Sequence, residues 1–186
     1  MSYAVRLASP KDAQKLLSIY QYYVNNTAIT FETEVPTIEE FEQRIRTMLL
    51  THPYLVVFDT NEPETLLGYA YAHAFYGRAA YSHSAEVSIY LDWKTRGKHL
   101  GSLLYNRLEE LLVAQHVTNL IAVITSADEG GSIGFHEHMG YRTVGTLNNC
   151  GYKFSSWYSV TWMEKIIAPH EPNPLVFIPF SQMQQL

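Results

Sequence analysis

The chain has 186 residues, of which 47% are hydrophobic and 17% are charged, and its formal net charge is −5 at pH 7. This length and composition fit one folded domain with a sizeable core and exclude a chain that is disordered throughout. The negative charge argues against a nucleic-acid partner, which would need a basic surface. Any affinity for anions must therefore be local.

Hydrophobic periodicity predicts a strand, two helices and three strands in the first half of the chain. Thr37 and Glu40 form a possible capping box at the start of the second helix. The turn-rich segment TNEPET indicates an antiparallel hairpin with an irregular loop. We expect these elements at about residues 3–8, 10–25, 38–48, 54–59, 66–75 and 84–91.

The strand over 84–91 alternates simply, so its side chains fall into two sets unless a bulge intervenes. One face would carry Glu86, Ser88 and Tyr90, and the other would carry Ala85, Val87, Ile89 and Leu91.

In the second half of the chain, the same periodicity predicts a helix, a strand, a short helix and two strands. The apolar run NLIAVITS suits a central strand that is covered on both faces. The preceding helix would connect it to the strand over 84–91 as a parallel crossover. The expected ranges are about 100–116, 119–126, 131–139, 141–149 and 156–166, with GYKF as a turn or loop before the last strand. The predicted fold is α/β, a mixed sheet of about seven strands with about four helices.

The last residues depart from this pattern, so we divide the chain into a domain over 1–167 and a Pro-rich apolar tail over 168–186. Pro169, Pro172 and Pro174 favour an extended path. The segment LVFIPF is too apolar to stay in solvent, so we expect it to dock on its own domain. A partner or a second subunit is the alternative.

Cys150 is the only cysteine, which makes an internal disulfide impossible. A reducing, cytoplasmic location is the simplest interpretation. The N-terminal sequence MSYAVRLASPKDA lacks the apolar core of a signal peptide, and no apolar run is long enough for a membrane span.

The segment TRGKHLGS, residues 95–102, lies between a predicted strand and a predicted helix. Unpaired N–H groups at a helix start favour an anion, Gly97 and Gly101 permit close approach, and Arg96 and Lys98 add positive charge. The spacing matches neither a Walker loop nor a dinucleotide-binding loop. From spacing alone, an anion site and a plain turn remain equal alternatives.

The stretch Arg96-Gly97-Lys98-His99-Leu100-Gly101 resembles the acetyl-CoA loop, Q/R-x-x-G-x-G/A, of the GCN5-related N-acetyltransferase (GNAT) superfamily. Five further segments occur in the order and spacing of its phosphinothricin acetyltransferase-like branch: FETEVPTIEEFEQRI, GYAYAHAFYGRAAY, AEVSIYL, AVITSADEGGSIGFHEHMGY and GYKFSSWYSV. That branch includes methionine sulfone and sulfoximine acetyltransferases. The resemblance covers about residues 3–165.

The resemblance implies that acetyl-CoA binds as co-substrate, without a metal. Its pyrophosphate would lie on the loop, whose candidate residues are Arg96, Gly97, Lys98, His99, Leu100, Gly101 and Ser102. Its pantetheine arm would follow Ile89, Tyr90 and Leu91, in a V-shaped gap where that strand parts from 119–126. Ser132 and Glu129 would also contact it.

Two positions depart from the family pattern. His99 replaces the middle glycine, so either the backbone there is already helical and tolerates a side chain, or affinity for acetyl-CoA is reduced. Glu129 stands where relatives commonly have asparagine, and a carboxylate can accept a hydrogen bond from a pantetheine amide but cannot donate one.

Acetyl transfer to an amine needs a base, because most amines are protonated at neutral pH. Glu86 stands alone in an uncharged strand, and the resemblance makes it the catalytic base instead of an ordinary surface carboxylate. His136 falls where many superfamily members have a general-acid tyrosine, although a buried, satisfied histidine is the structural alternative. His136 and His138 point to different sides of a helix, which argues against a metal site.

An amino-acid substrate would present a carboxylate, for which Arg78 is our choice. Tyr81 precedes the candidate base, and Phe31 and Trp157 resemble family positions that line the substrate pocket. Core packing is the alternative for Trp157.

The sequence thus predicts a cytoplasmic enzyme that acetylates a small amine such as phosphinothricin, methionine sulfone or methionine sulfoximine. The alternatives are a protein or peptide N-acetyltransferase and a non-catalytic CoA-binding module. The resemblance also implies a homodimer, with no nucleic-acid or membrane partner.

Overall fold

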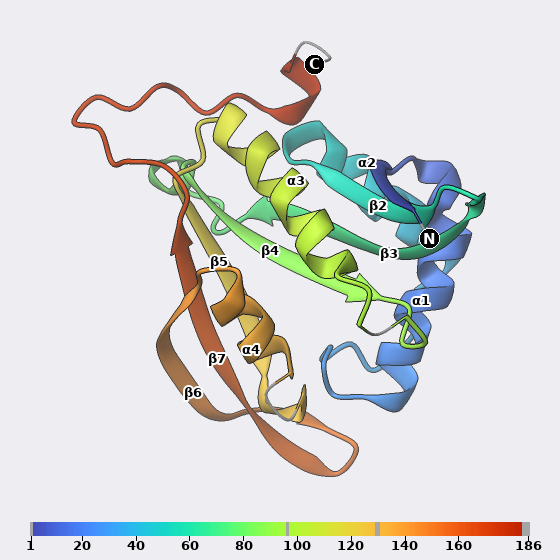
Figure 1. The fold of residues 1–186 in the computed structure, drawn as a ribbon. Coiled ribbons are helices and arrows are strands. Elements are labelled where there is room, and N and C mark those ends of the chain that lie inside the picture. Colours follow the sequence, from blue (N-terminus) through green and yellow to red (C-terminus); the bar gives the residue numbers. More distant parts are fainter. Residues whose placement is uncertain (1, 96, 129–130, 184–186) are drawn as a thin grey trace.

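A computed structural model describes residues 2–95, 97–128 and 131–183 and shows one mixed sheet with helices on both faces (Figure 1). The strand order is β1-β2-β3-β4-β5-β7-β6, and β4–β5 is the parallel pair among antiparallel neighbours in the described part of the chain. The strands are β1 (Tyr3–Leu7), β2 (Tyr54–Asp59), β3 (Glu62–Ala74), β4 (Ser84–Leu91), β5 (Asn119–Thr125), β6 (Arg142–Lys153) and β7 (Ser156–Ile166). The helices are α1 (Ala13–Asn26), α2 (Ile38–Thr51), α3 (Leu100–Ala114) and α4 (Gly131–His138). The predicted fold class and element order are confirmed.

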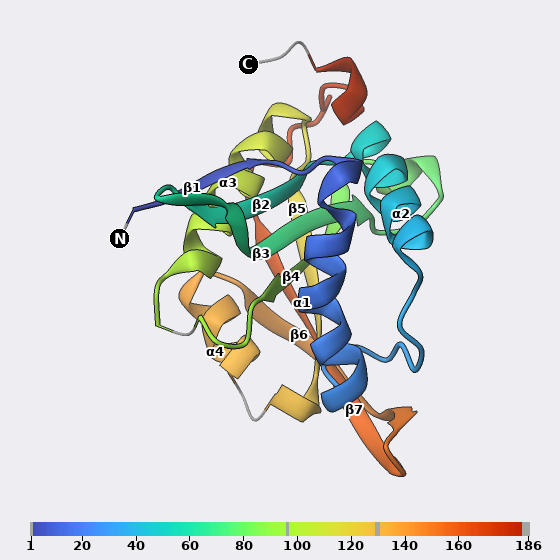
Figure 2. The ribbon, with the colours of Figure 1, turned by 90° about the vertical axis from the view of Figure 1, so that its right-hand side faces the viewer.

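The two faces of the sheet carry separate cores. Helices α1 and α2 cover one face, and α3 and α4 cover the other (Figure 2). Leucines at helical spacing bury α3 against the strands, and a smaller set of apolar and aromatic residues buries α1 and α2. The residues that anchor them are Leu100, Leu104, Leu108 and Leu112 on α3, and Leu16, Tyr20, Phe41 and Ile45 on α1 and α2.

Strand β4 pairs with β3 without a register shift, from Gly68↔Leu91 to Ala74↔Ala85. The predicted alternation therefore holds. The ring of Tyr90 packs against that of Tyr20 on the α1/α2 face, while Val87 belongs to the core under α3. Glu86 shares the face of Tyr90.

The structure moves two predicted boundaries. Strand β3 starts at Glu62, so TNEPET is a tight turn followed by strand, and shifts in register with β2 absorb the extra residues. The backbone N–H of Asn61 donates to the Asp59 carboxylate (2.9 Å), which closes that turn.

Strand β6 likewise continues through most of GYKF. Its turn is Phe154–Ser155, and both residues have positive φ (48° and 58°), as a two-residue hairpin of the type I′ class requires. Neither residue is the glycine or asparagine that normally signals such a turn, which is why the sequence pattern placed a loop there.

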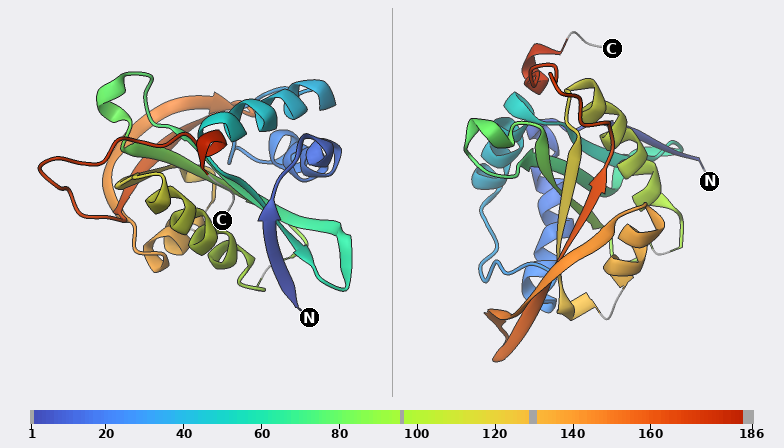
Figure 3. Two further views of the ribbon diagram at one scale, coloured as in Figure 1. Left: turned by 90° about the horizontal axis from the view of Figure 1, so that it is seen from above. Right: turned by 90° about the vertical axis from the view of Figure 1, so that its left-hand side faces the viewer.

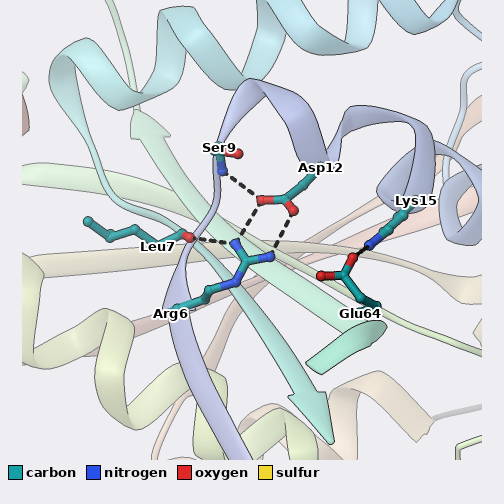
Figure 4. A network of polar contacts seen from close by, with 6 residues as sticks. All are labelled: Arg6, Leu7, Ser9, Asp12, Lys15 and Glu64. Atoms are coloured by element: carbon teal, nitrogen blue, oxygen red, sulfur yellow. Dashed lines mark hydrogen bonds and ion pairs between the residues drawn. The ribbon is translucent and has the colours of Figure 1, made fainter. Parts of the chain in front are cut away.

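Polar contacts join β1 to the start of α1 (Figure 4). Two guanidinium nitrogens of Arg6 each donate to a different carboxylate oxygen of Asp12, both at 2.8 Å. The Asp12 carboxylate also accepts a hydrogen bond from the backbone N–H of Ser9. The capping box of α2 is confirmed, because Thr37 and Glu40 exchange hydrogen bonds of 2.8 and 3.1 Å. These contacts fix both helix starts on their face of the sheet.

The tail docks on its own domain, as predicted. It leaves β7, crosses the end of α3 and reaches α2 (Figures 1 and 3). The N–H of Ile178 donates to the carbonyl of Gln115 (3.1 Å), and the hydroxyl of Ser181 donates to the carbonyl of Leu50 (2.8 Å). Within the described ranges, no helix is both long and apolar enough to cross a bilayer.

Candidate active site

The only parallel junction of the described sheet opens soon after it begins. Strands β4 and β5 pair at three positions, Ser84↔Asn119, Ala85↔Leu120 and Glu86↔Ile121. Beyond these pairs the strands separate, and we call the opening between 87–91 and 122–125 the β4–β5 split. It holds a narrow cavity of about 60 Å³ lined by Ile29, Val87, Ser88, Ile89, Tyr90, Tyr105, Ala122, Val123, Ile124, Thr125, Ser132 and His136.

The predicted anion loop leads from β4 into α3. Gly97 has φ 72°, and His99, the residue before the helix, has φ 56° and ψ 21°. His99 is thus in the left-handed conformation, and the expectation that its backbone is already helical is wrong. The His99 side chain does not cap the helix, and the first N–H groups of α3 have no acceptor within the helix. Arg96 lies outside the described residues.

Gly101 serves packing. A Cβ at this position would lie 2.9 Å from the ring of Phe135 on α4 and 3.5 Å from Ile89. The absent side chain lets α3 approach α4 and β4 closely. Lys98, in the loop, places its ammonium 5.8 Å from the centroid of the Tyr3 ring.

The candidate pantetheine residues divide between the split and the core. Ile89, Tyr90 and Ser132 line the cavity in the split, and Leu91, at the end of β4, does not. The Leu91 carbonyl accepts a hydrogen bond from the Tyr23 hydroxyl (2.6 Å), which uses one of its two lone pairs. Glu129 lies outside the described residues.

His136 faces the split from α4 and is almost completely buried. Its Nδ1 lies 2.7 Å from the carbonyl oxygen of Ser132 and its Nε2 lies 3.0 Å from the hydroxyl of Tyr105. Burial lowers the pKa of His136, so the ring is neutral near pH 7. A carbonyl can only accept, so Nδ1 carries the proton and Nε2 accepts from Tyr105.

Tyr105 is a residue that the sequence analysis missed. It lies on α3 beside the leucine stripe, it is buried, and burial raises the pKa of its phenol. A hydroxyl on a face otherwise made of leucines was the available signal. Because His136 uses both ring nitrogens, Tyr105 is the hydroxyl that this pair presents to the split.

Glu86 lies where the last β4–β5 pair ends, on the face of α1 and α2. Its side chain is 26% exposed, and its Oε1 lies 3.7 Å from Nε2 of His73 on β3. Burial raises the pKa of Glu86, and the charge of His73 opposes this. His73 was also missed, because its strand reads as a plain alternating apolar one.

The four predicted substrate residues lie on two loops and one hairpin. Phe31 lies on the α1–α2 connection and packs over Gly151, where an added Cβ would lie 2.2 Å from its ring. Arg78 and Tyr81 belong to the β3–β4 connection. The Trp157 side chain is 63% exposed beside Tyr152 near the β6–β7 turn, so its core-packing alternative is wrong. None of the four lines the split.

The described residues contain no group of three or more histidine, cysteine, aspartate or glutamate side chains arranged to hold a metal ion.

The chain matches the acetyltransferase (GNAT) domain over residues 5–162. It is 35% identical to phosphinothricin N-acetyltransferase of Streptomyces coelicolor, covering 87% of this chain and 94% of that protein. It is 32% identical to the L-methionine sulfoximine/L-methionine sulfone acetyltransferase of Pseudomonas aeruginosa, covering 94% of this chain and all of that protein.

Solved structures with a similar fold are also N-acetyltransferases. A phosphinothricin acetyltransferase from Sinorhizobium meliloti in complex with acetyl-CoA has a TM-score of 0.83 and 32% identity, with 89% of each chain covered. A ribosomal-protein-alanine N-acetyltransferase from Brucella melitensis has a TM-score of 0.81 and 30% identity, with 88% of this chain and 99% of that chain covered.

The chain therefore belongs to the GNAT family of acetyltransferases. It is an acetyl-CoA-dependent N-acetyltransferase, as the sequence predicted, which disfavours a non-catalytic CoA-binding module.

The residues present fit acetyl-CoA. The β4–β5 split leaves one edge of β4 without a strand beside residues 87–91, and a thin polar chain could pair there. The free N–H groups at the start of α3 follow directly and suit a pyrophosphate.

Proposed function

We propose that the protein acetylates the amino group of a small amino-acid-like substrate of the phosphinothricin or methionine sulfoximine/sulfone type, with Glu86 as general base. The observation that carries this proposal is the position of Glu86, a half-buried carboxylate at the mouth of the β4–β5 split. The named relatives supply the substrate class.

Glu86 would accept the proton that the attacking amine must lose. Burial raises the pKa of this carboxyl, which makes its carboxylate a stronger base than an exposed one. Nε2 of His73 lies 3.7 Å from the carboxylate, which is too far for a short hydrogen bond. It would hold the carboxylate in place and leave its oxygens available to accept the proton.

When bound, acetyl-CoA supplies the acetyl group as a thioester that is activated toward amines. Ile89 and Tyr90 would hold its pantetheine arm, and the start of α3, Leu100 to Ser102, would hold its pyrophosphate. The Tyr105 hydroxyl donates its proton to Nε2 of His136, so it would present its oxygen, as a hydrogen-bond acceptor, to the reacting end of the split. His136 is then a positioning residue, and Tyr105 is the group that touches the reactants.

Arg78 and Phe31 would contact the amino acid. The guanidinium matches a carboxylate in geometry, and Arg78 is exposed before the Ala79–Tyr81 turn. The Phe31 ring, fixed over Gly151, offers an apolar surface for the side chain of the substrate. Tyr81 and Trp157 would also contact the substrate, as the family resemblance implies.

The left-handed His99 gives a direct test of the cofactor loop. His99→Gly keeps this conformation without cost, whereas His99→Val makes it strained, because β-branched residues rarely adopt positive φ. We expect His99→Gly to bind acetyl-CoA at least as tightly as the parent, and His99→Val to bind about tenfold more weakly, in proportion to about 1–2 kcal/mol of strain. Equal affinities measured by calorimetry would mean that this loop does not hold the cofactor.

The function is tested by CoA release from acetyl-CoA with a panel of amines. We expect turnover with phosphinothricin, methionine sulfone or methionine sulfoximine. If only other free amino acids are acetylated, the three named substrates are wrong but the small-amine class stands. If no small amine is acetylated, the proposed substrate class is refuted.

A peptide amine is the second candidate, favoured by the likeness to the ribosomal-protein-alanine N-acetyltransferase. An array of peptides with free N-termini, with and without lysine, separates the two. Higher kcat/KM on a peptide than on any free amino acid would select this candidate.

We also propose a homodimer. The β6–β7 hairpin exposes the apolar side chains Leu147, Tyr152, Phe154 and Trp157, a patch that a second copy would cover. A monomer in sedimentation velocity experiments at micromolar concentration would refute the dimer.

A further inference from the structure

The tail is fastened to its domain on both sides of Phe177. Nδ1 of His116 lies 2.7 Å from the carbonyl oxygen of Val176. The side-chain amide of Gln115 donates to the carbonyls of both Ile178 (2.8 Å) and Thr51 (2.7 Å). Gln115 is fully buried, so these hydrogen bonds are shielded from water. The tail therefore has a defined place against the ends of α2 and α3.

This fastening places the Phe177 ring on His52, the residue directly after α2. The ring centroids are 5.2 Å apart and the planes are 32° from parallel. His52 is only 3% exposed, and its Nδ1 lies 3.0 Å from the hydroxyl of Thr51. Phe177 thus covers a histidine that would otherwise lie at the surface end of β2.

His52 stands in a row that ends at Glu86. Tyr54 pairs with Tyr71, and the Ala72 N–H donates to the Pro53 carbonyl (3.2 Å), which continues the β2–β3 ladder to the level of His73. His73 pairs in turn with Glu86, and their side chains are 3.7 Å apart. The row therefore runs from the tail across β2 and β3 to β4.

We propose that the docked tail segment Val176–Ser181 contributes to the acid–base site: by covering His52 with Phe177, it keeps water and charge away from the far end of the row that positions Glu86. The effect on catalysis rests on the proposed role of Glu86 as the base. Phe177 and His52 are positioning residues here, since neither touches the reacting atoms.

The charges around the row determine how loss of Phe177 would change the protonation of His52 and Glu86. Burial, with the charge of His73, lowers the pKa of His52 to about 4, so His52 stays neutral where the enzyme would work. The other titratable and charged groups described on this face include the Arg44–Glu32 ion pair (2.7 Å) and the phenols of Tyr20, Tyr54, Tyr69, Tyr71 and Tyr90. Removing Phe177 would hydrate His52, let it take a proton near its ordinary pKa, and place a positive charge in the row. That charge favours the ionised form of Glu86.

A histidine titration by NMR, without substrate or acetyl-CoA, tests the cover directly. In Phe177→Ala we expect the pKa of His52 to rise by about one unit or more. Phe177→Leu keeps an apolar cover and should resemble the parent. Leu175→Ala, at an exposed tail position, is the matched control. An unchanged His52 titration in a folded Phe177→Ala protein would overturn the proposal.

The pH profile of kcat/KM tests the effect on catalysis. In Phe177→Ala the acid limb should move to lower pH by about half a unit, which is about a threefold gain in relative rate on that limb. A tail that only stabilises the fold would lower the melting temperature and leave the limb in place, and this result would overturn the catalytic part. If no amine is acetylated by the parent, the proposed function fails, while the NMR titration still decides whether the tail controls the row.

Discussion

The two sides of the β4–β5 split differ in their access to water. On the α3/α4 side, His136 and Tyr105 are buried and each completes the hydrogen bonding of the other. On the α1/α2 side, Glu86 remains partly exposed and has one histidine close by at 3.7 Å. The dry side fixes a hydroxyl in one orientation, and the wetter side keeps a carboxylate that can exchange protons with solvent.

The difference assigns separate tasks to the two sides. A base must regain its resting state after each turnover, so contact with water is useful to it. A hydrogen-bonding group that must keep one orientation works best where water cannot compete for its partner. Four experiments test this division.

Removal of the proposed base should have the largest effect. Glu86→Gln keeps the shape of the side chain and abolishes its basicity, so we expect kcat to fall by about 10²–10⁴-fold with acetyl-CoA affinity unchanged. Steady-state kinetics and calorimetry measure the two quantities. A variant that keeps parental kcat would show that the base is elsewhere.

Loss of the Tyr105 hydroxyl should come next. Tyr105→Phe leaves Nε2 of His136 buried without a partner, so we expect a loss of about 1–3 kcal/mol in unfolding free energy and a fall of roughly ten- to hundredfold in kcat. Tyr141→Phe is the matched control, because within the described residues its buried hydroxyl has no hydrogen-bond partner. If both variants behave alike in denaturant titrations and kinetics, the pairing has no role.

Close packing on the dry side gives the third test. Gly101→Ala forces a Cβ to within 2.9 Å of the Phe135 ring, and such overpacking costs about 1–3 kcal/mol. Gly134→Ala, in α4, meets no atom within 4 Å and should stabilise the helix by up to about 1 kcal/mol. Thermal unfolding of both variants should therefore give shifts of opposite sign.

The buried histidine predicts a smaller, pH-dependent effect. Because burial lowers the pKa of His136 in the folded protein, the unfolded chain binds its proton more tightly. Stability from this group is complete above about pH 6.5 and is lost as the pH falls, at up to about 1.4 kcal/mol per unit.

Urea titrations between pH 7.5 and 5 measure this slope, to which buried His52 also contributes. His136→Gln should flatten the slope. Replacement of the exposed His170 by Gln should leave it unchanged. A slope unaffected by His136→Gln would show that the dry side is hydrated.

The fold was predictable because its signals are local. The leucine stripe of α3, the alternation of β4 and the capping box of Thr37 and Glu40 each specify an element without tertiary information. The β6–β7 turn was not predictable, since Phe154 and Ser155 adopt positive φ only because the two long strands impose it.

The candidate active site was less predictable from the sequence than the fold. Glu86 and His136 came from family resemblance; the structure places both at the split, and their catalytic roles stay predictions. Tyr105 offered a weak signal, a hydroxyl beside a leucine stripe, and His73 offered none, since what makes both relevant is a contact with a residue 31 or 13 positions away. His99 shows the opposite limit, because the sequence identified the unusual residue but left its backbone conformation open, and the structure excludes the helical alternative.

The three residue pairs that join β4 to β5 are also the shortest seam of the sheet. One way to strengthen the fold would be to extend that seam by further strand pairing. Each added pair would fill the space where the donor molecule is expected to bind. Selection for thermal stability and selection for turnover would therefore compete at this one junction, and stabilising substitutions without loss of activity should be sought elsewhere in the protein.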